Sequence, residues 1–99
     1  WILFPLWQPQ WINAVYDLRI LEEPKGIYKS DSAFLVAHHG LKSKLSDRAL
    51  KHLSNIRLSV PAITEMDRLM NVEKLSPRAA AERWIAANPE VVASWRPEI

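Results

Sequence analysis

The sequence predicts an α/β fold with about two short strands and four to five helices. An almost wholly apolar run, Trp1 to Leu6, ends at a Pro/Gln turn, which is typical of a strand buried on both faces of a sheet. A second β-prone run, Ala33 to Ala37, lies between a polar Ser-Asp-Ser segment and Gly40. From Ser46 onward, apolar residues recur at three-to-four spacing, as they do in amphipathic helices.

Between the two predicted strands, a short helix and a turn are expected. Pro9 suits the first turn of a helix, because its φ is already set and its missing N–H costs nothing there. Trp11, Ile12, Val15 and Tyr16 would form the apolar side of this helix. Residues 18–21 are expected to be briefly extended, and Pro and Gly make 22–26 a turn.

The second half of the chain is predicted to be helical, and each helix has a polar start signal. These signals are Ser46, Ser59, Ser76-Pro77 and Asn88-Pro89. The residues expected to face inward are Leu50, Leu53, Ile56, Ile63, Met66, Leu69, Met70, Ala80, Ala81, Trp84, Ile85, Val91, Val92 and Trp95. This is more helix than two strands can use, so we expect the helices to lie on a sheet completed by other chain segments.

Composition bounds the class of protein. With 99 residues, 48% apolar and 24% charged, the chain amounts to one domain at most. The net charge of +2 is spread among apolar residues, which disfavours a nucleic-acid partner. No apolar run approaches the ~18 residues of a membrane span, and no secretory signal pattern is present. Because the sequence opens within a predicted strand and without Met, we expect residues 1–99 to be a single partial domain of a longer polypeptide.

The sequence shows no constellation of catalytic or metal-binding residues. His38, His39 and His52 lack the spacing of a helical zinc site, and the chain has no cysteine. The two glycines, Gly26 and Gly40, form no phosphate-binding loop, and no G-x-S-x-G elbow occurs. We therefore expect a protein that is not an enzyme and that uses no metal or other cofactor.

The tryptophans differ in what their positions suggest. Trp84 and Trp95 fall at core positions of amphipathic helices, and Trp11 lies on the inner side of the short helix. Trp7 lies at the carboxyl end of a predicted buried strand, where open α/β sheets bind ligands. A strand-end tryptophan can also cap a core, so both interpretations of Trp7 stay open at this point.

Several motifs resemble, in order and spacing, the substrate-binding proteins of glycine betaine, choline and carnitine ABC transporters. That family has a W-x-P-H/Q-W turn, then Y-D-L, an L-x-D/E-P-K-G turn, a strand, and helices that end in P-x-x-A-A-x-x-W/Y-I/V-x-x-N. The matching residues here are Trp7-Gln-Pro-Gln-Trp11, Tyr16-Asp17-Leu18, Leu21-Glu-Glu-Pro-Lys-Gly26, Pro77-Arg-Ala-Ala80, Trp84-Ile85 and Asn88. The resemblance covers essentially the whole chain.

The resemblance implies part of one lobe of a two-lobed, type II periplasmic-binding-protein-like fold. Such a protein closes over a quaternary ammonium ligand, glycine betaine or a relative, in a cage of aromatic rings. A trimethylammonium group donates no hydrogen bond, so ring faces hold it by cation–π attraction of about 0.5 to 2 kcal/mol each. The implied partner is an ABC transporter permease, and the implied location is the periplasmic or extracellular face of the membrane.

The resemblance also assigns site residues. The family's first cage tryptophan falls on Trp7, and Gln10, Trp11 and Tyr16 are secondary candidates near it. Gln10 stands where other members carry His, which is expected to alter polar contacts or ligand choice. The remaining cage tryptophans belong to family segments that this sequence does not contain, so we expect it to supply one wall of a cage.

Two further interpretations stay open. The chain could be a helical interaction fragment that self-associates, as a homodimer or a swapped oligomer, and binds no ligand of its own. The other interpretation is an enzyme that acts on a quaternary amine, but no acid/base pair in the sequence supports it. The ligand-binding and self-association interpretations differ in whether Trp7 is accessible at a concave site or buried against Trp11.

Overall fold

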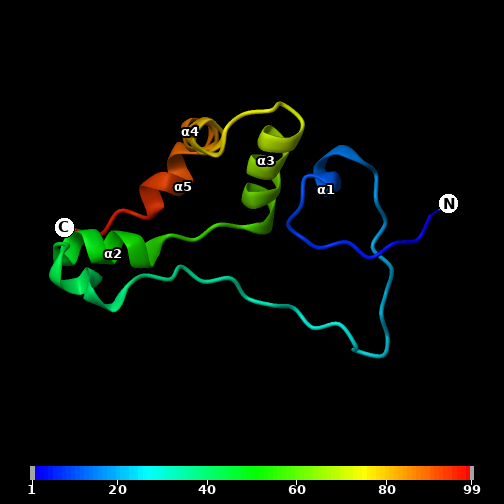
Figure 1. Cartoon of the computed structure of the whole chain (residues 1–99), viewed down its shortest axis with the longest axis horizontal. Coiled ribbons are helices and arrows are strands. Elements are labelled where there is room, and N and C mark those ends of the chain that lie inside the picture. Colours follow the sequence, from blue (N-terminus) through cyan, green and yellow to red (C-terminus); the bar gives the residue numbers. More distant parts are fainter. Residues whose placement is uncertain (1, 99) are drawn as a thin grey trace.

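The computed structural model describes residues 2–98, and its regular elements are all helical (Figure 1). In chain order they are α1 (Ile12–Val15), the 3-10 helix η1 (His39–Ser43), α2 (Asp47–Asn55), α3 (Val60–Asn71), α4 (Pro77–Ala87) and α5 (Pro89–Ser94). Helices α3 and α4 pack against each other, α1 packs on α3, and α5 follows α4 directly. No helix in the described part of the chain is long and apolar enough to cross a membrane.

Three predicted helix starts are confirmed by their capping hydrogen bonds. The hydroxyls of Ser46, Ser59 and Ser76 accept from the backbone N–H three residues ahead, at 3.2, 3.2 and 3.1 Å. Each bond satisfies one of the N–H groups that a helix start leaves without a partner. Asn88 precedes α5 as predicted, but its side chain does not cap the start of α5; it donates to the carbonyl of Trp84 in the last turn of α4 (2.8 Å).

The predicted short helix exists but begins later than expected. Pro9 lies in a bend before α1, and Trp11 is the N-cap residue of that helix. The following turn around Pro24 and Lys25 is confirmed. Gly26 there has a positive φ of 61°, which glycine adopts without a steric cost.

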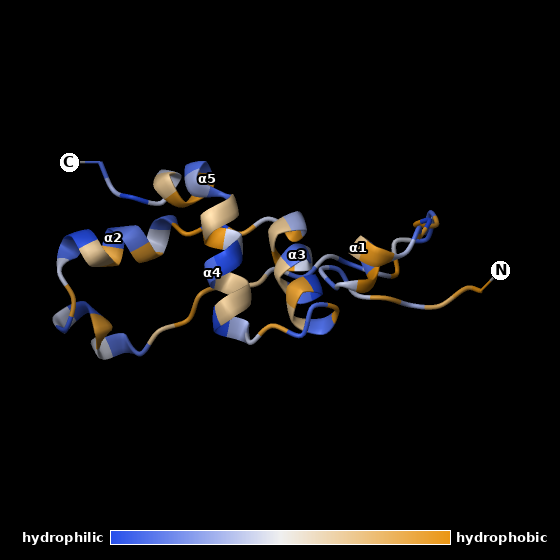
Figure 2. Cartoon of the chain, turned by 90° about the horizontal axis from the view of Figure 1, so that it is seen from above, coloured by the Kyte–Doolittle hydropathy of each residue, from blue (hydrophilic) through white to orange (hydrophobic). Residues whose placement is uncertain are grey.

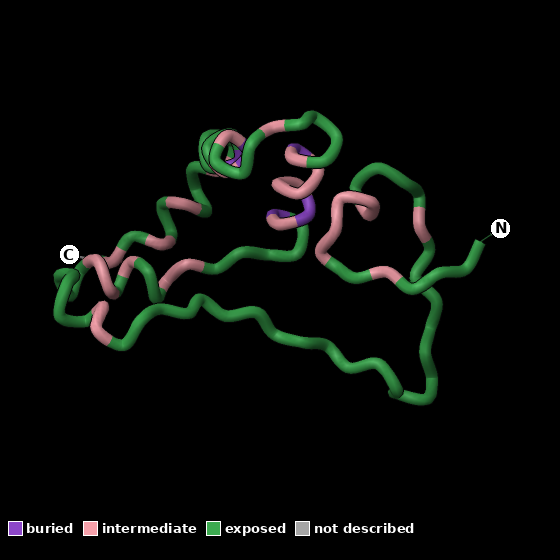
Figure 3. The backbone as a smooth tube through the Cα atoms, viewed as in Figure 1, coloured by how far each residue is buried: buried purple, intermediate pink, exposed green. Residues whose placement is uncertain are grey.

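The core lies between α3 and α4 (Figure 3). Its buried apolar residues are Ala62, Leu69, Ala80 and Trp84, of which Leu69 is 3% and Trp84 6% exposed. The ring of Trp84 stacks on that of Trp95, with centroids 6.1 Å apart, so the packing role predicted for Trp84 is confirmed. Three residues that were expected to face inward, Leu53, Ile85 and Val91, are exposed.

The predicted α/β class is wrong for this structure, because residues 2–98 contain no strand. The predicted strands are residues 1–6, of which Trp1 lies outside the described residues, and residues 33–37. Residues 2–6 and 33–37 lie far apart and form no ladder (Figure 1). Val36 is 91% exposed, so the second segment is not buried on either face. A strand is stabilised by cross-strand pairs, and neither segment has another strand beside it. The partial lobe with two strands is therefore not observed.

The molecule is extended for its length. Its radius of gyration is 17.2 Å, against about 13 Å for a compact chain of this size. Its accessible surface of 9014 Å² exceeds the roughly 5,800 Å² expected of a compact protein of 11.4 kDa. Hydrophobic residues occur along the segments outside the helices as well as within the helices (Figure 2). Much apolar surface is consequently left in contact with solvent.

Candidate functional site

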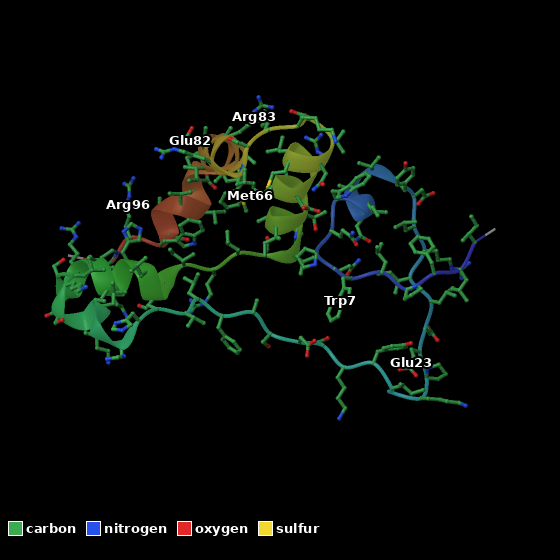
Figure 4. The ribbon with its side chains drawn as sticks, viewed as in Figure 1. Trp7, Glu23, Met66, Glu82, Arg83 and Arg96 are labelled. Atoms are coloured by element: carbon green, nitrogen blue, oxygen red, sulfur yellow. The ribbon has the colours of Figure 1, made fainter. Side chains whose placement is uncertain are left out.

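The candidate site is the turn of residues 7–11 that precedes α1. Trp7 is 74% exposed, and its side chain points away from α1 and α3, on the side where the extended segment 27–38 runs (Figure 4). Its indole faces are therefore accessible to a ligand in solution. The expected concave site is not formed around it, because Trp7 does not line either of the two main hollows of the described residues.

Asn13 closes this turn from within α1. Its side-chain amide donates to the carbonyl of Gln10 (3.2 Å), and its backbone N–H donates to the same oxygen (3.1 Å). Its Oδ1 atom accepts from Nε2 of Gln8 (3.3 Å). A single asparagine thus ties both glutamines of the turn, as asparagine often does with nearby backbone groups.

A carboxylate on α3 holds the same turn from across the chain. The backbone N–H of Trp11 donates to Oδ2 of Asp67 at 2.7 Å, a contact between residues 56 positions apart. The amide of Asn71 donates to Oδ1 of Asp67 (2.9 Å), one helical turn further along α3. Hydrogen bonds to a charged acceptor are stronger than neutral ones, so this contact connects the turn firmly to the helix that contains Leu69.

The secondary candidates lie around this turn without enclosing a space. Gln10 and Trp11 are half-buried, and Tyr16 is exposed. The rings of Trp11 and Tyr16 are tilted, with centroids 6.4 Å apart, and so contact each other. The turn therefore presents the exposed ring of Trp7, while Trp11 and Tyr16 pack on each other.

The main groove lies elsewhere, between α3, α4 and α5, with a volume of about 700 Å³. Trp84 and Leu69 contribute to its apolar lining, and its charged rim residues pair with one another. Arg68 bonds both Glu65 (2.8 Å) and Glu73 (3.1 Å), and Arg83 also bonds Glu73. The bond from Arg68 lowers the pKa of Glu65, and these carboxylates raise the pKa of Arg68.

Residues with metal-binding side chains are dispersed. Within residues 2–98, no three His, Asp or Glu side chains come together as a metal site would need. His38 and His39 lie ring against ring, 4.2 Å apart, and Nδ1 of His38 accepts from the N–H of Gly40. Through this bond His38 caps the start of η1.

Sequence reasoning missed Asn13 and Asp67. Asp67 lies four residues after Ile63 and three before Met70, which puts a carboxylate on the predicted apolar stripe of α3. Such a position signals a partner, because a carboxylate on an inward stripe needs hydrogen bonds. The spacing of residues could not show that the partner of Asp67 is the backbone amide of Trp11.

Comparison with known proteins decides the family. The sequence model of the substrate binding domain of the ABC-type glycine betaine transport system matches residues 1–87. The chain belongs to this family. It is a family of transporter substrate-binding domains and not of enzymes. The motif resemblance found in the sequence is thereby confirmed.

A curated member of this family gives the same result. The chain is 30% identical over 90 residues to the glycine betaine/carnitine transport binding protein GbuC of Listeria monocytogenes serotype 1/2a (strain 10403S). The match covers 90% of this chain and 29% of that protein, so the chain spans less than a third of its relative's length. No solved structure matches the chain.

Proposed function

We propose that this chain contributes to the binding of glycine betaine or a related quaternary ammonium solute for uptake by an ABC transporter. One observation carries the proposal: Trp7 lies in the segment that matches the family, in a turn that Asn13 and Asp67 hold at Gln10 and Trp11, and its ring is exposed. The methylated cation would lie against the ring face of Trp7 by cation–π attraction. Gln10, Trp11 and Tyr16, in or next to the same turn, are secondary candidates for contact with the ligand.

The energies indicate that Trp7 acts as one wall among several. A single ring contributes about 0.5 to 2 kcal/mol, whereas a Kd of 1 mM already requires about 4.1 kcal/mol. Further walls would come from a longer, two-lobed protein of which residues 1–99 are one partial domain. That protein would work at the periplasmic or extracellular face of the membrane and deliver its ligand to a permease.

Tryptophan fluorescence during titration with glycine betaine and with choline tests the proposal. The wild-type chain is compared with Trp7→Ala, and Tyr28→Ala serves as a control that removes another exposed aromatic ring outside the turn. We expect a saturable change with a Kd above about 1 mM in the wild type and in Tyr28→Ala, and no saturable change in Trp7→Ala. The same saturable change in Trp7→Ala would overturn the assignment.

A second candidate function is self-association without ligand binding. The exposed apolar segments around Leu3 and Val36 favour it, because an unpaired β-prone segment is a template for another chain. In this case a homodimer or swapped oligomer would bury part of the excess surface. Size-exclusion chromatography at several concentrations separates the candidates: a concentration-dependent dimer supports self-association, and a monomer at all concentrations excludes it.

A further inference from the structure

Asp67 stands out among the charged residues because it supports a loop that is distant in sequence. The other acidic side chains of α3 and the α3–α4 loop, Glu65 and Glu73, pair with arginines. Asp67 instead accepts the Trp11 N–H at 2.7 Å and an amide hydrogen of Asn71 at 2.9 Å. Its two carboxylate oxygens therefore point to the turn and back to its own helix.

The contact matters because α1 and the turn have little stability of their own. Helix α1 has four residues, fewer than an isolated helix needs, and none of them is buried. The bonds made by Asn13 close the turn but leave it unconnected to the core. Packing of α1 on α3 is non-directional, whereas the Asp67 bond fixes the amide at one position.

We propose that Asp67 is a positioning residue for the Trp7 wall, an inference that rests on the proposed function. By holding the Trp11 amide on α3, it sets the direction in which the turn presents Trp7. Ligand affinity then depends on a carboxylate that lies 56 residues after Trp11 and touches no ligand. Asn71 keeps the carboxylate in the rotamer that reaches the turn.

Three variants separate positioning from general stability. Asp67→Ala removes the acceptor, whereas Asp67→Asn keeps a carbonyl oxygen that can accept the Trp11 N–H. Asp31→Ala makes the same change to an exposed carboxylate in the segment between the Gly26 turn and η1. Circular dichroism and the stacked Trp84–Trp95 pair report whether the α3–α4 core is intact.

The first readout needs no ligand: the heteronuclear NOE of the Trp7 and Trp11 backbone amides, which reports ps–ns motion. We expect reduced values in Asp67→Ala and values near wild type in Asp67→Asn and Asp31→Ala, with the core signals unchanged. Equal values in wild type and Asp67→Ala would overturn the inference.

The second readout is the glycine betaine titration. We expect binding about 2- to 10-fold weaker in Asp67→Ala, as loss of one hydrogen bond allows, and largely restored in Asp67→Asn. Wild-type affinity in Asp67→Ala would also overturn the inference. Absence of binding by the wild type, with the NOE differences as expected, would overturn the proposed function and leave the Asp67 assignment standing.

Discussion

At the scale of single residues, two small polar side chains decide how the aromatic turn is presented. Asn13 acts within the turn and Asp67 acts from α3. Together they form hydrogen bonds with three residues of the Trp-Gln-Pro-Gln-Trp motif, namely Gln8, Gln10 and Trp11. The exposed ring of Trp7 is then free to contact a cation. The Trp7 ring and the Asn13 and Asp67 side chains that hold the turn are thus separate parts of the site.

The Glu65–Arg68 pair gives a residue-scale prediction about pH. The folded-state pKa of Glu65 lies below its ordinary value of 4.5, so the stabilisation is complete above pH 4.5 and is lost as pH falls through the folded-state pKa. We expect Glu65→Gln to lower Tm by about 2 °C at pH 7, as for a partly exposed pair, and to have a smaller effect at the acid end. Thermal unfolding between pH 7 and 3 measures this.

The control for this prediction is Glu22→Gln, which changes an exposed carboxylate in the loop before the Gly26 turn. Its Tm difference from wild type should stay near zero at every pH. A Glu65→Gln difference that is constant across the range would contradict the assigned cause.

At the scale of elements, the sequence predicts what is local and misses what depends on distant segments. Ser46, Ser59 and Ser76 were recognisable as caps because each bond spans three residues. The Asp67–Trp11 bond spans 56 residues and leaves only an indirect sign in the apolar stripe of α3.

The predicted strands failed for the same reason. Residues 2–6 and 33–37 have β-prone composition, but a strand forms only beside another strand. Propensity alone therefore predicted strands where the described chain forms no regular element.

The caps give a prediction at this scale. Ser59→Ala and Ser76→Ala each remove an acceptor from a helix start, and we expect each to reduce the free energy of unfolding by about 1 kcal/mol. Urea denaturation followed by circular dichroism measures the change. Ser32→Ala, in an extended exposed segment, is the matched control, and an equal loss in that variant would refute the capping argument.

The α3–α4 core gives a second prediction. Leu69 is 3% exposed and Leu35 is 70% exposed, so the same leucine-to-alanine change tests burial directly. We expect Leu69→Ala to cost about 2 to 5 kcal/mol and Leu35→Ala less than about 0.5 kcal/mol. Near-ultraviolet circular dichroism, which senses the Trp84–Trp95 stack, follows the loss, and similar effects of the two changes would contradict the assigned core.

At the scale of the whole molecule, a small helical core carries long segments that bury little. The extended dimensions and the excess accessible surface follow from this division. Small-angle X-ray scattering of the monomer should give a radius of gyration near 17.2 Å. A value near 13 Å would show that the extended segments fold back onto the helices.

We propose that Trp7 is the part of this chain that contacts a quaternary ammonium ligand. The most direct measurement is a titration with glycine betaine that follows the indole N–H resonances of the 5 tryptophans by NMR. We expect a saturable shift of the Trp7 resonance while those of Trp84 and Trp95 stay in place. No shift of Trp7 up to tens of millimolar ligand, or a shift confined to Trp84 and Trp95, would contradict it.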